Sequence, residues 1–341
     1  MHDTSFAWAI VGPGAIAQRF ATAVFGLPDA HVHAVLGRDA QRAQEFATRW
    51  SCKGIIPQVY TDLAAMLSDP GVRAVYVATP HAQHGEVVRA CLLAGKAVLC
   101  EKPLVPNLAE GQRLVELAQQ QSVFLMEALW TRFLPAYEVM GGWLQQQAIG
   151  PVRALQSSFC FNAPYDPHSR MFDPALAGGA LLDIGIYNLA VTRWVLEMAQ
   201  GQCPDVLRMQ ADGVLAPTGV DQRVSATLVF PDSVTSQFVC GFDSSSANAL
   251  HILGERGCIT LPRDFWQAQQ AVLEVAGQPA QTVETPFRIN GFEGEIEEAM
   301  RCVRAGLVQS PRMPHAESLA LLGWMDELRR QMGVRYPFEL S

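Results

Sequence analysis

Two short segments of the sequence contain side chains that could move a proton. One is Cys-Glu-Lys-Pro, which places Lys102 after an apolar run, and the other is Gly-Gly-Ala-Leu-Leu-Asp-Ile-Gly-Ile-Tyr, which ends at Tyr187. A lysine ammonium can orient a hydroxyl group and lower its pKa, and a tyrosine beside such a charge can pass a proton. Asp183 and Tyr187 share one face of a predicted helix, where Asp183 could orient the reacting group or Lys102. Spacing alone favours a buried hydrogen-bonded Asp–Tyr pair.

A glycine turn, Gly-Pro-Gly-Ala-Ile-Ala, lies between the first apolar run and a helical pattern. This context is what a G-x-G-x-x-A motif needs in order to indicate a dinucleotide site. Gly12 permits the tight turn, Gly14 lets the backbone approach a pyrophosphate, and Ala17 allows close helix–strand packing. The backbone N–H groups of the first helical turn, around Ala15 and Ile16, favour bound phosphate. A turn that binds nothing is the disfavoured alternative.

The end of the second predicted strand indicates which dinucleotide binds. An NAD site usually has Asp or Glu there for the ribose 2′-hydroxyl. Here the tip carries Arg38, and Arg42 follows one helical turn later. Two guanidinium groups suit a 2′-phosphate, so NADP is favoured over NAD. Asp39 is the competing ribose ligand, although it is better placed to cap the next helix, and ordinary solvated arginines remain the alternative.

A third polar segment begins with Thr79 and ends with His84, after another predicted strand. Ligands of parallel sheets bind beyond the carboxyl ends of the strands, so Thr79 and Pro80 are expected beside the nicotinamide. His84 is expected to contact the ribose or the Glu101 backbone. The spacing of His81 and His84 could suggest a metal, but no third ligand accompanies them, so no metal is expected.

The elements that must hold these groups alternate in the first part of the chain. Apolar runs typical of strands lie at 6–11, 32–37, 74–78, 97–100 and 123–126. Helical patterns lie at 16–25, 40–50, 63–67, 85–94 and 108–121. Such alternation predicts βαβ units and a parallel sheet, so we expect a doubly wound Rossmann domain over residues 1–127.

The pattern changes after Gly150-Pro151. Longer strand-like segments lie at 152–161, 223–230, 234–242, 249–253 and 271–275. Helices are expected at 180–197, 292–305 and 315–332. These segments predict an α+β domain over 128–341 with an open, mostly antiparallel sheet that has one face on helices. The C-terminal helix is expected to pack back against the first domain.

Composition excludes several classes of protein. The 341 residues are 49% hydrophobic and 17% charged, which argues for two domains with ample cores and against disorder. A net charge of -8 argues against nucleic acid or an anionic membrane as partner. Neither a signal peptide nor a segment that could span a bilayer is evident. The eight cysteines are scattered without a C-x-x-C pair, which is typical of buried thiols in a reducing cytoplasm.

Taken in order, these motifs resemble the glucose-fructose oxidoreductase / inositol dehydrogenase (Gfo/Idh/MocA) family. The segment Glu101-Lys102-Pro103 is similar to its E-K-P motif, and the stretch ending at Tyr187 is similar to its G-G-x-x-x-D-x-G-x-(H/Y) motif. The resemblance is closer to the branch of dimeric dihydrodiol dehydrogenases and NADP-dependent D-xylose 1-dehydrogenases. The segments similar to that branch are M-E-A-L-W-T-R-F at 126–133, L-L-D-I-G-I-Y at 181–187, M-D-E-L-R-R-Q at 325–331 and R-Y-P-F at 335–338.

The resemblance implies a Rossmann domain joined to an α+β domain whose exposed sheet face forms a homodimer interface in relatives. It implies Lys102 and Tyr187 as the proton-handling pair, with Asp183 in support. Many relatives have His at the position of Tyr187, whereas this branch has Tyr. His81 departs from the Asn common in the wider family, so its role stays open.

The resemblance also implies further contacts with the cofactor and the substrate. Glu101 and Arg170 are expected near the cofactor together with Lys102, and the two arginines after the second strand match those used on a 2′-phosphate. Three aromatic residues are expected to wall the substrate pocket, namely Trp130, Phe159 and Trp266. For Phe159 and Trp266 a place in the core is nearly as well supported.

The activity implied is reversible hydride transfer between NADP and a hydroxyl-bearing carbon of a sugar or diol. An aldose such as D-xylose is the first candidate, a trans-dihydrodiol the second, and an amino or deoxy sugar precursor the third. The alternative is a non-catalytic regulator of the same fold that senses dinucleotide or sugar. The presence of Lys102, Asp183 and Tyr187 together argues against it, because a sensor needs binding but no proton transfer.

Overall fold

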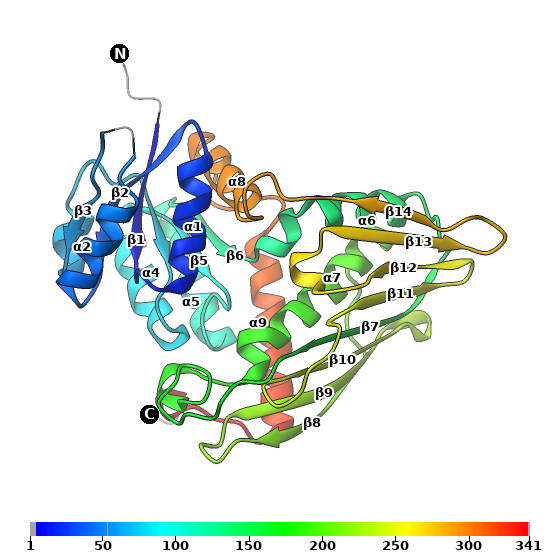
Figure 1. The fold of residues 1–341 in the computed structure, drawn as a ribbon. Helices are drawn as coiled ribbons and strands as arrows, with labels where there is room; N and C mark the ends of the chain where they lie inside the picture. The colour runs from blue at the N-terminus through cyan, green and yellow to red at the C-terminus, as the bar shows by residue number, and fades with distance from the viewer. Residues whose placement is uncertain (1–4, 53, 340–341) are drawn as a thin grey trace. The chain divides into compact units, whose positions relative to one another are not determined.

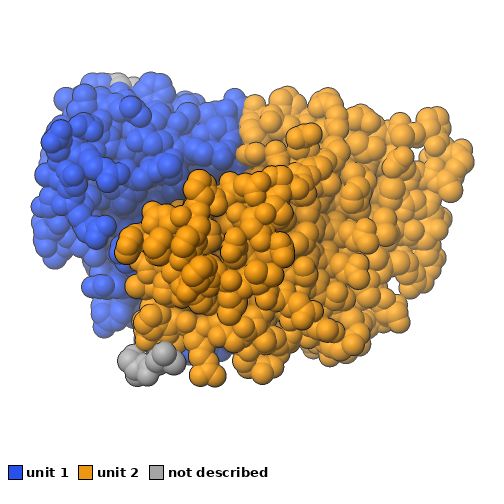
Figure 2. Space-filling model, turned by 60° about the horizontal axis from the view of Figure 1, so that its bottom comes forward, with its two compact units in different colours: residues 1–130, 288–320 blue, residues 131–287, 321–341 orange. Residues whose placement is uncertain are grey.

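A computed structural model describes residues 5–52 and 54–339, shown as a ribbon in Figure 1. The chain forms two compact units, which Figure 2 colours separately. Unit 1 is Met1–Trp130 with Arg288–Ala320, and unit 2 is Thr131–Phe287 with Leu321–Ser341. The chain therefore leaves unit 1 after its first third, and a later segment returns to it.

Unit 1 is built on a six-stranded sheet with the order β3-β2-β1-β4-β5-β6. The strands are β1 (Phe6–Val11), β2 (Ala30–Leu36), β3 (Gln58–Tyr60), β4 (Ala74–Val77), β5 (Ala97–Glu101) and β6 (Leu125–Ala128). All neighbouring pairs are parallel, which confirms the expected Rossmann-type sheet. The sequence analysis missed β3, because three residues with little burial give no periodic signal.

The helices of unit 1 begin close to their expected positions. They are α1 (Ala15–Gly26), α2 (Ala40–Arg49), α3 (Leu63–Leu67), α4 (His84–Leu93), α5 (Leu108–Gln121) and, from the returning segment, α8 (Glu293–Arg304). Asp39 caps α2 and Asn107 caps α5, as their side-chain types predict. Helix α8 lies beside α1 (Figure 1), where the Asn290 side-chain amide donates to the Arg19 carbonyl at 2.8 Å.

Unit 2 contains an eight-stranded sheet with the order β14-β13-β12-β11-β7-β10-β9-β8. The strands are β7 (Val152–Cys160), β8 (Arg208–Leu215), β9 (Asp221–Val229), β10 (Thr235–Gly241), β11 (Leu250–Gly254), β12 (Gly257–Leu261), β13 (Gln270–Val275) and β14 (Gln281–Glu284). Only the pairing of β7 with β10 is parallel among those described, which confirms the mostly antiparallel sheet. Strands β8, β12 and β14 were not predicted; β8 and β14 are edge strands with little burial.

Helices α6 (Pro135–Gln145) and α7 (Ile186–Gln200) cover one face of this sheet (Figure 1). Helix α7 is preceded by a π-helical turn, η4 (Leu181–Gly185). The expectation of one regular helix over 180–197 is therefore wrong at its start. The last long helix, α9 (His315–Met332), contributes residues to both units.

One helical stretch, Pro174–Gln200, is long and apolar enough to cross a membrane by length and composition alone. The expectation that no segment meets this test is wrong for this stretch. In the structure 89% of its most apolar window is buried, as in the core helix of a folded unit. Its apolar character therefore reflects packing between α6 and the sheet of unit 2.

Candidate active site

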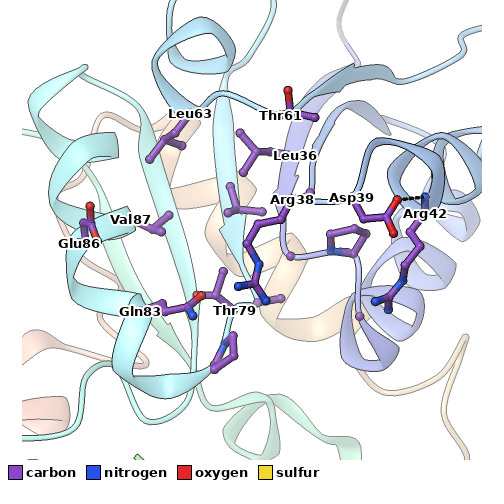
Figure 3. A pocket seen from close by; sticks show the side chains of 17 residues that line it. Leu36, Arg38, Asp39, Arg42, Thr61, Leu63, Thr79, Gln83, Glu86 and Val87 are labelled. Carbon is purple, nitrogen blue, oxygen red and sulfur yellow. Dashed lines mark hydrogen bonds between the residues drawn. The ribbon is translucent and has the colours of Figure 1, made fainter. Parts of the chain in front are cut away.

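A cavity of about 680 Å³ lies in unit 1, beyond the carboxyl ends of β1, β2 and β4 (Figure 3). Six residues that the sequence analysis assigned to the cofactor line it: Gly12, Gly14, Arg38, Arg42, Thr79 and Pro80. Others were not predicted, because no motif marks them: Leu36, Thr61, Leu63, Gln83, Glu86 and Val87. The cavity lies where parallel sheets bind their ligands, and we call it the cofactor cavity.

The two glycines of the turn after β1 differ in what surrounds them. Gly12 has φ +89°, and a Cβ there would lie 2.7 Å from the Ala78 carbonyl oxygen, so the fold itself requires glycine. Gly14 has φ -90°, which any residue adopts, and a Cβ there would meet no described atom within 4 Å. Among the described residues no side chain caps α1 after Gly14. An uncapped helix start beside open space fits a phosphate group.

Arg38 and Arg42 carry the positive charge of the cofactor cavity. Both are exposed, and neither forms an ion pair within residues 5–52 and 54–339. Figure 3 shows their side chains directed the same way, with Asp39 turned toward α2. The Asp39 carboxylate accepts hydrogen bonds from the backbone N–H groups of Gln41 (2.9 Å) and Arg42 (3.1 Å). The one acid at the tip of β2 is therefore used as a helix cap, as expected.

The segment after β4 contains a polar atom that the protein leaves unsatisfied. Thr79 lines the cofactor cavity, and its buried hydroxyl has no hydrogen-bond partner among the described residues. Buried polar groups are nearly always paired, so this hydroxyl is available to a polar atom of a bound ligand. Thr79, Gly14 and the two arginines together fit a dinucleotide.

His84 is fully buried, between two loops of unit 1. Its Nδ1 lies 2.9 Å from the Pro103 carbonyl oxygen, and its Nε2 lies 2.8 Å from the Thr79 carbonyl oxygen. Burial lowers the pKa of the imidazole, although the carbonyl hydrogen bonds oppose this. The ring thus joins the Thr79 segment to the turn after Lys102. The expected contact was with the ribose or the Glu101 backbone, and the backbone carbonyl that the ring contacts in this turn is that of Pro103. The contact of His84 with the cofactor stays a prediction.

His81 is buried and packs edge-on against His84, with the ring centroids 5.8 Å apart. Nowhere in the described parts of the chain do three His, Cys, Asp or Glu side chains gather as a metal site would require. The three-residue spacing of His81 and His84 therefore brings their rings into contact with each other.

Lys102 follows the last residue of β5 and is half-buried. The preceding Glu101 is buried and accepts a hydrogen bond from the Tyr76 hydroxyl. After the cis Lys102–Pro103 bond, the Leu104 backbone N–H donates to Glu127 Oε1 at 2.8 Å. Burial raises the pKa of Glu127 to about 7. Glu127 thus holds the turn beside Lys102, a role that the sequence analysis missed.

In unit 2, Asp183 and Tyr187 lie in η4 and in the first turn of α7, and both are buried. Arg170 Nη1 donates to Asp183 Oδ1 at 3.0 Å. The side chain of Arg170 is 56% exposed, so this ion pair is partly solvated. The structure therefore gives Arg170 a partner within unit 2, and its contact with the cofactor stays a prediction.

Two of the three aromatic residues expected at the substrate lie in one cluster with Tyr187, which Phe159 contacts directly and Trp266 through Phe159. The Phe159 ring centroid is 5.7 Å from that of Tyr187, and the Trp266 ring stacks on Phe159 at 3.3 Å. We call Phe159, Tyr187 and Trp266 the aromatic cluster. Trp130 belongs to unit 1, where its ring packs 4.9 Å from Phe292, and its place in a substrate pocket stays a prediction.

A buried carboxylate that the sequence analysis missed anchors the start of η4. Asp221 Oδ2 accepts from the Leu181 backbone N–H at 2.6 Å, and a Cβ on Gly179 would collide with Asp221 Oδ1. Gly179 has φ +121°, so glycine is required there twice over. Burial raises the pKa of Asp221 to about 6. No local signal could have found Asp221, because its partner lies 40 residues away.

Two protein-family models match most of the chain. A family model described as "Oxidoreductase family, NAD-binding Rossmann fold" matches residues 6–129, and the GFO/IDH/MocA C-terminal domain model matches residues 137–260. The chain belongs to the Gfo/Idh/MocA family. The resemblance seen in the motifs is thereby confirmed, and so is the expected dinucleotide-dependent oxidoreductase with an NAD-binding Rossmann domain.

Full-length relatives agree with this assignment. The chain is 38% identical to trans-1,2-dihydrobenzene-1,2-diol dehydrogenase of Mus musculus and 36% identical to that of Homo sapiens, over 97% of this chain and 98% of each relative. A 3-ketoreductase structure from Actinomadura kijaniata, solved with NADP and TDP-benzene, has a TM-score of 0.82 and 25% identity over 96% of this chain and 98% of that one. Aldose-aldose oxidoreductase from Caulobacter crescentus shares the fold, with a TM-score of 0.83 and 23% identity over 96% of this chain and 97% of that one.

Proposed function

We propose that the chain is an NADP-dependent dehydrogenase that acts on a hydroxyl-bearing carbon of a sugar or diol. The observation that carries the cofactor choice is that Arg38 and Arg42, after β2, form no ion pair with any residue that the structure describes. Arg38 stands where an NAD site would have an acid, and the neighbouring acid, Asp39, is engaged in capping α2. The related 3-ketoreductase solved with NADP supports the same choice.

In the proposed mechanism the cofactor performs the redox chemistry, and side chains of the protein transfer the proton. NADP+ supplies a hydride acceptor when bound. Tyr187 in its phenolate form takes the proton of the substrate hydroxyl and becomes a neutral phenol, and the Lys102 ammonium favours the phenolate. Asp183, neutralised by Arg170, orients the reacting group. The proposal requires Lys102 and Tyr187 to reach one substrate molecule.

The aromatic cluster supports a ring-shaped substrate. The flat Phe159–Trp266 stack, whose Phe159 ring lies 5.7 Å from the Tyr187 ring, suits the C–H face of a sugar ring or the ring of a cyclic diol. The murine and human relatives are named for trans-1,2-dihydrobenzene-1,2-diol. We therefore propose a trans-dihydrodiol and an aldose such as D-xylose as the two substrates to test first.

The experiment measures NADPH formation with trans-1,2-dihydrobenzene-1,2-diol, D-xylose and a panel of other sugars, each with NADP+ and with NAD+. Turnover is expected with NADP+, and Lys102→Met and Tyr187→Phe are expected to bind NADPH normally but to lose kcat by about 100-fold or more. Tight NADPH binding without turnover of any substrate would favour a non-catalytic sensor. Full activity of Lys102→Met would exclude its assigned role.

We also infer that two copies of the chain pair through the open face of the eight-stranded sheet, as the family resemblance implies. That face presents polar side chains, including Gln156, Gln210, Thr227 and Gln237. Light scattering is expected to give the mass of a dimer. Gln237→Arg would bring like charges together across a pairing of equivalent faces and is expected to give a monomer. A monomeric parent chain would contradict the inference.

We propose a cytoplasmic location. The eight cysteines are free thiols, and five of them are buried. Free thiols persist in reducing compartments, whereas exported proteins tend to form disulfides. Fractionation of cells that produce the tagged chain would test this, and recovery outside the cytoplasm would contradict it.

A further inference from the structure

The Gly178–Gly179 turn that leads into η4 is held at several backbone atoms. The Gly178 N–H donates to the Asp173 carbonyl at 3.0 Å, and the Gly179 N–H donates to the Met171 carbonyl at 2.9 Å. The Gly178 carbonyl accepts from the Tyr336 hydroxyl at 2.7 Å. This last bond joins segments 158 residues apart, so the C-terminal end of the chain reaches the turn that precedes Asp183 and Tyr187.

Tyr336 is held by charged side chains from the last turns of α9 and from the segment after it. Its backbone N–H donates to Glu339 Oε2 at 3.1 Å, and the Arg329 guanidinium lies 4.7 Å from its ring centroid. Arg329 in turn donates to both oxygens of Glu339 at 3.0 and 2.9 Å, and to Asp326 at 2.7 Å. We call Arg329, Tyr336 and Glu339 the C-terminal latch. Tyr336 is fully buried and Arg329 is nearly so, so the latch is a packed part of unit 2.

The C-terminal segment lies beside the segment before η4 (Figure 1). The short helical turns Pro174–Leu176 and Pro337–Glu339 are in contact. Both belong to unit 2, as do Asp183 and the aromatic cluster. The latch therefore contacts the segment that leads into η4 and α7, which carry the residues proposed to handle the substrate proton.

We propose that Tyr336 is a positioning residue whose hydroxyl, through the Gly178 carbonyl, sets the place of η4 and the first turn of α7. The Asp183 N–H donates to the Gly179 carbonyl at 3.2 Å, so a shift of the turn passes directly to Asp183. π-Helical turns are rare and poorly self-supporting, so their placement depends on such anchors. The inference rests on the proposed function, because it assumes that Asp183 and Tyr187 act on the substrate.

A positioning role differs from a purely structural one in what it changes. The bond that Tyr336 makes lies wholly within unit 2, whereas the cofactor cavity is lined by residues of unit 1. Loss of the hydroxyl should therefore slow the chemical step without weakening the binding of NADPH. A purely structural role would lower stability and leave the rate of the folded enzyme unchanged.

The test is Tyr336→Phe in the full chain, with the substrate that the parent enzyme oxidises. The variant keeps the ring beneath Arg329 and removes only the hydroxyl. We expect kcat to fall about tenfold, the Kd of NADPH to stay within about twofold, and the primary deuterium isotope effect on kcat to rise as hydride transfer becomes slower than product release. The isotope effect is measured with substrate deuterated at the carbon that loses hydride.

Tyr60→Phe is the matched control, because it removes a tyrosine hydroxyl that donates to Asp69 at 2.9 Å in unit 1. It is expected to leave kcat and the isotope effect unchanged. If Tyr336→Phe does not fold, Glu339→Gln keeps the hydroxyl but loosens the latch, and a threefold or larger loss of kcat is expected from it (about 0.7 kcal/mol). Parental kcat and isotope effect in the folded latch variant would overturn the inference.

The latch and the proposed function can fail separately. If Tyr187→Phe keeps full activity, the proposed role of Tyr187 fails. If Tyr187→Phe is inactive while Tyr336→Phe has the parental kcat and isotope effect, only the latch fails. Loss of NADPH affinity in Tyr336→Phe as large as the loss of kcat would indicate general damage and would also overturn the inference.

Discussion

Gly14 in unit 1 and Gly179 in unit 2 differ in what surrounds them. In unit 1, a Cβ at Gly14 would meet no described atom within 4 Å, so the protein leaves that space open. In unit 2, a Cβ at Gly179 would collide with the carboxylate of Asp221, so the protein itself fills the space. The space beside the first glycine fits a ligand, and the second glycine is required by the fold. The turn at Gly14 thus leaves room for a ligand, whereas the turn at Gly179 is packed so that it fixes the positions of side chains.

The arginines at the cofactor cavity differ in a similar way from Arg170 and Arg329 of unit 2. Arg38 and Arg42 have no ion-pair partner in the described parts of the chain, and they face the cofactor cavity. Arg170 is paired with Asp183, and Arg329 is paired with Glu339 and Asp326. A charge without a protein partner is available for a charged ligand, whereas a paired charge fixes another side chain.

The largest expected effect comes from Gly179→Ala. Alanine would have to adopt φ +121°, which L residues rarely do, and its methyl group would collide with the Asp221 carboxylate. We expect a loss of unfolding free energy of about 4 kcal/mol and loss of dehydrogenase activity. Urea unfolding followed by circular dichroism measures the first, and NADPH formation measures the second.

Gly201→Ala is the matched control for the collision. Gly201 ends α7 with φ +82°, but a Cβ there would meet nothing within 4 Å. It is expected to lose about 1 kcal/mol, from the backbone conformation alone. Equal losses in the two variants would show that the contact with Asp221 contributes nothing.

These two regions also differ in how far the sequence predicted them. The tight turn at Gly12 and the helix cap formed by Asp39 were predictable, because the conformation of each depends on one local strand–turn–helix segment. The roles of Asp221 and Tyr336 were not, because their partners lie 40 and 158 residues away and a single buried polar side chain carries no periodic signal. The π-helical start of α7 was missed for the same reason, since distant anchors hold it and its local pattern is that of an α-helix.

The two units are alike in one respect: in each, a buried carboxylate accepts a backbone hydrogen bond from a segment next to a proposed catalytic residue. Glu127 accepts from the Leu104 backbone N–H in unit 1 and Asp221 from that of Leu181 in unit 2. Because burial raises the pKa of Glu127 from 4.5 to about 7, the folded state holds its proton more tightly than the unfolded state. Stability is therefore expected to fall as the pH rises through this range and to stay lower above it.

Glu127→Gln removes this titration while keeping an acceptor for Leu104. Relative to the parent, its unfolding free energy is expected to be higher at pH 8 than at pH 5 by about 2.5 kcal/mol. Denaturant unfolding at the two pH values measures the difference. Glu116→Gln, on the exposed side of α5, is the control and should show no such difference. A gain that is equal at both pH values would contradict the assignment.

Gly14→Ala tests whether the open space of unit 1 belongs to a ligand. The methyl group meets no protein atom, and φ -90° suits alanine, so the unfolding free energy should stay within about 0.5 kcal/mol of the parent. NADPH affinity is expected to fall about 30-fold, because the methyl group occupies the space of the pyrophosphate. Fluorescence titration measures the affinity, and a value within twofold of the parent would place the phosphates elsewhere.

The smallest effect expected is that of Arg38→Ala, and it decides what the unpaired cations of unit 1 are for. If they hold the 2′-phosphate, NADPH affinity should fall about tenfold, while NADH, which lacks that phosphate, should bind as before. Arg49→Ala removes a cation from the last turn of α2, outside the cofactor cavity, and should change neither affinity. Equal losses for both cofactors would mean that Arg38 supports the shape of the cavity. In that case the cations of unit 1, like those of unit 2, would serve the fold, and the contrast between the units would rest on Gly14 alone.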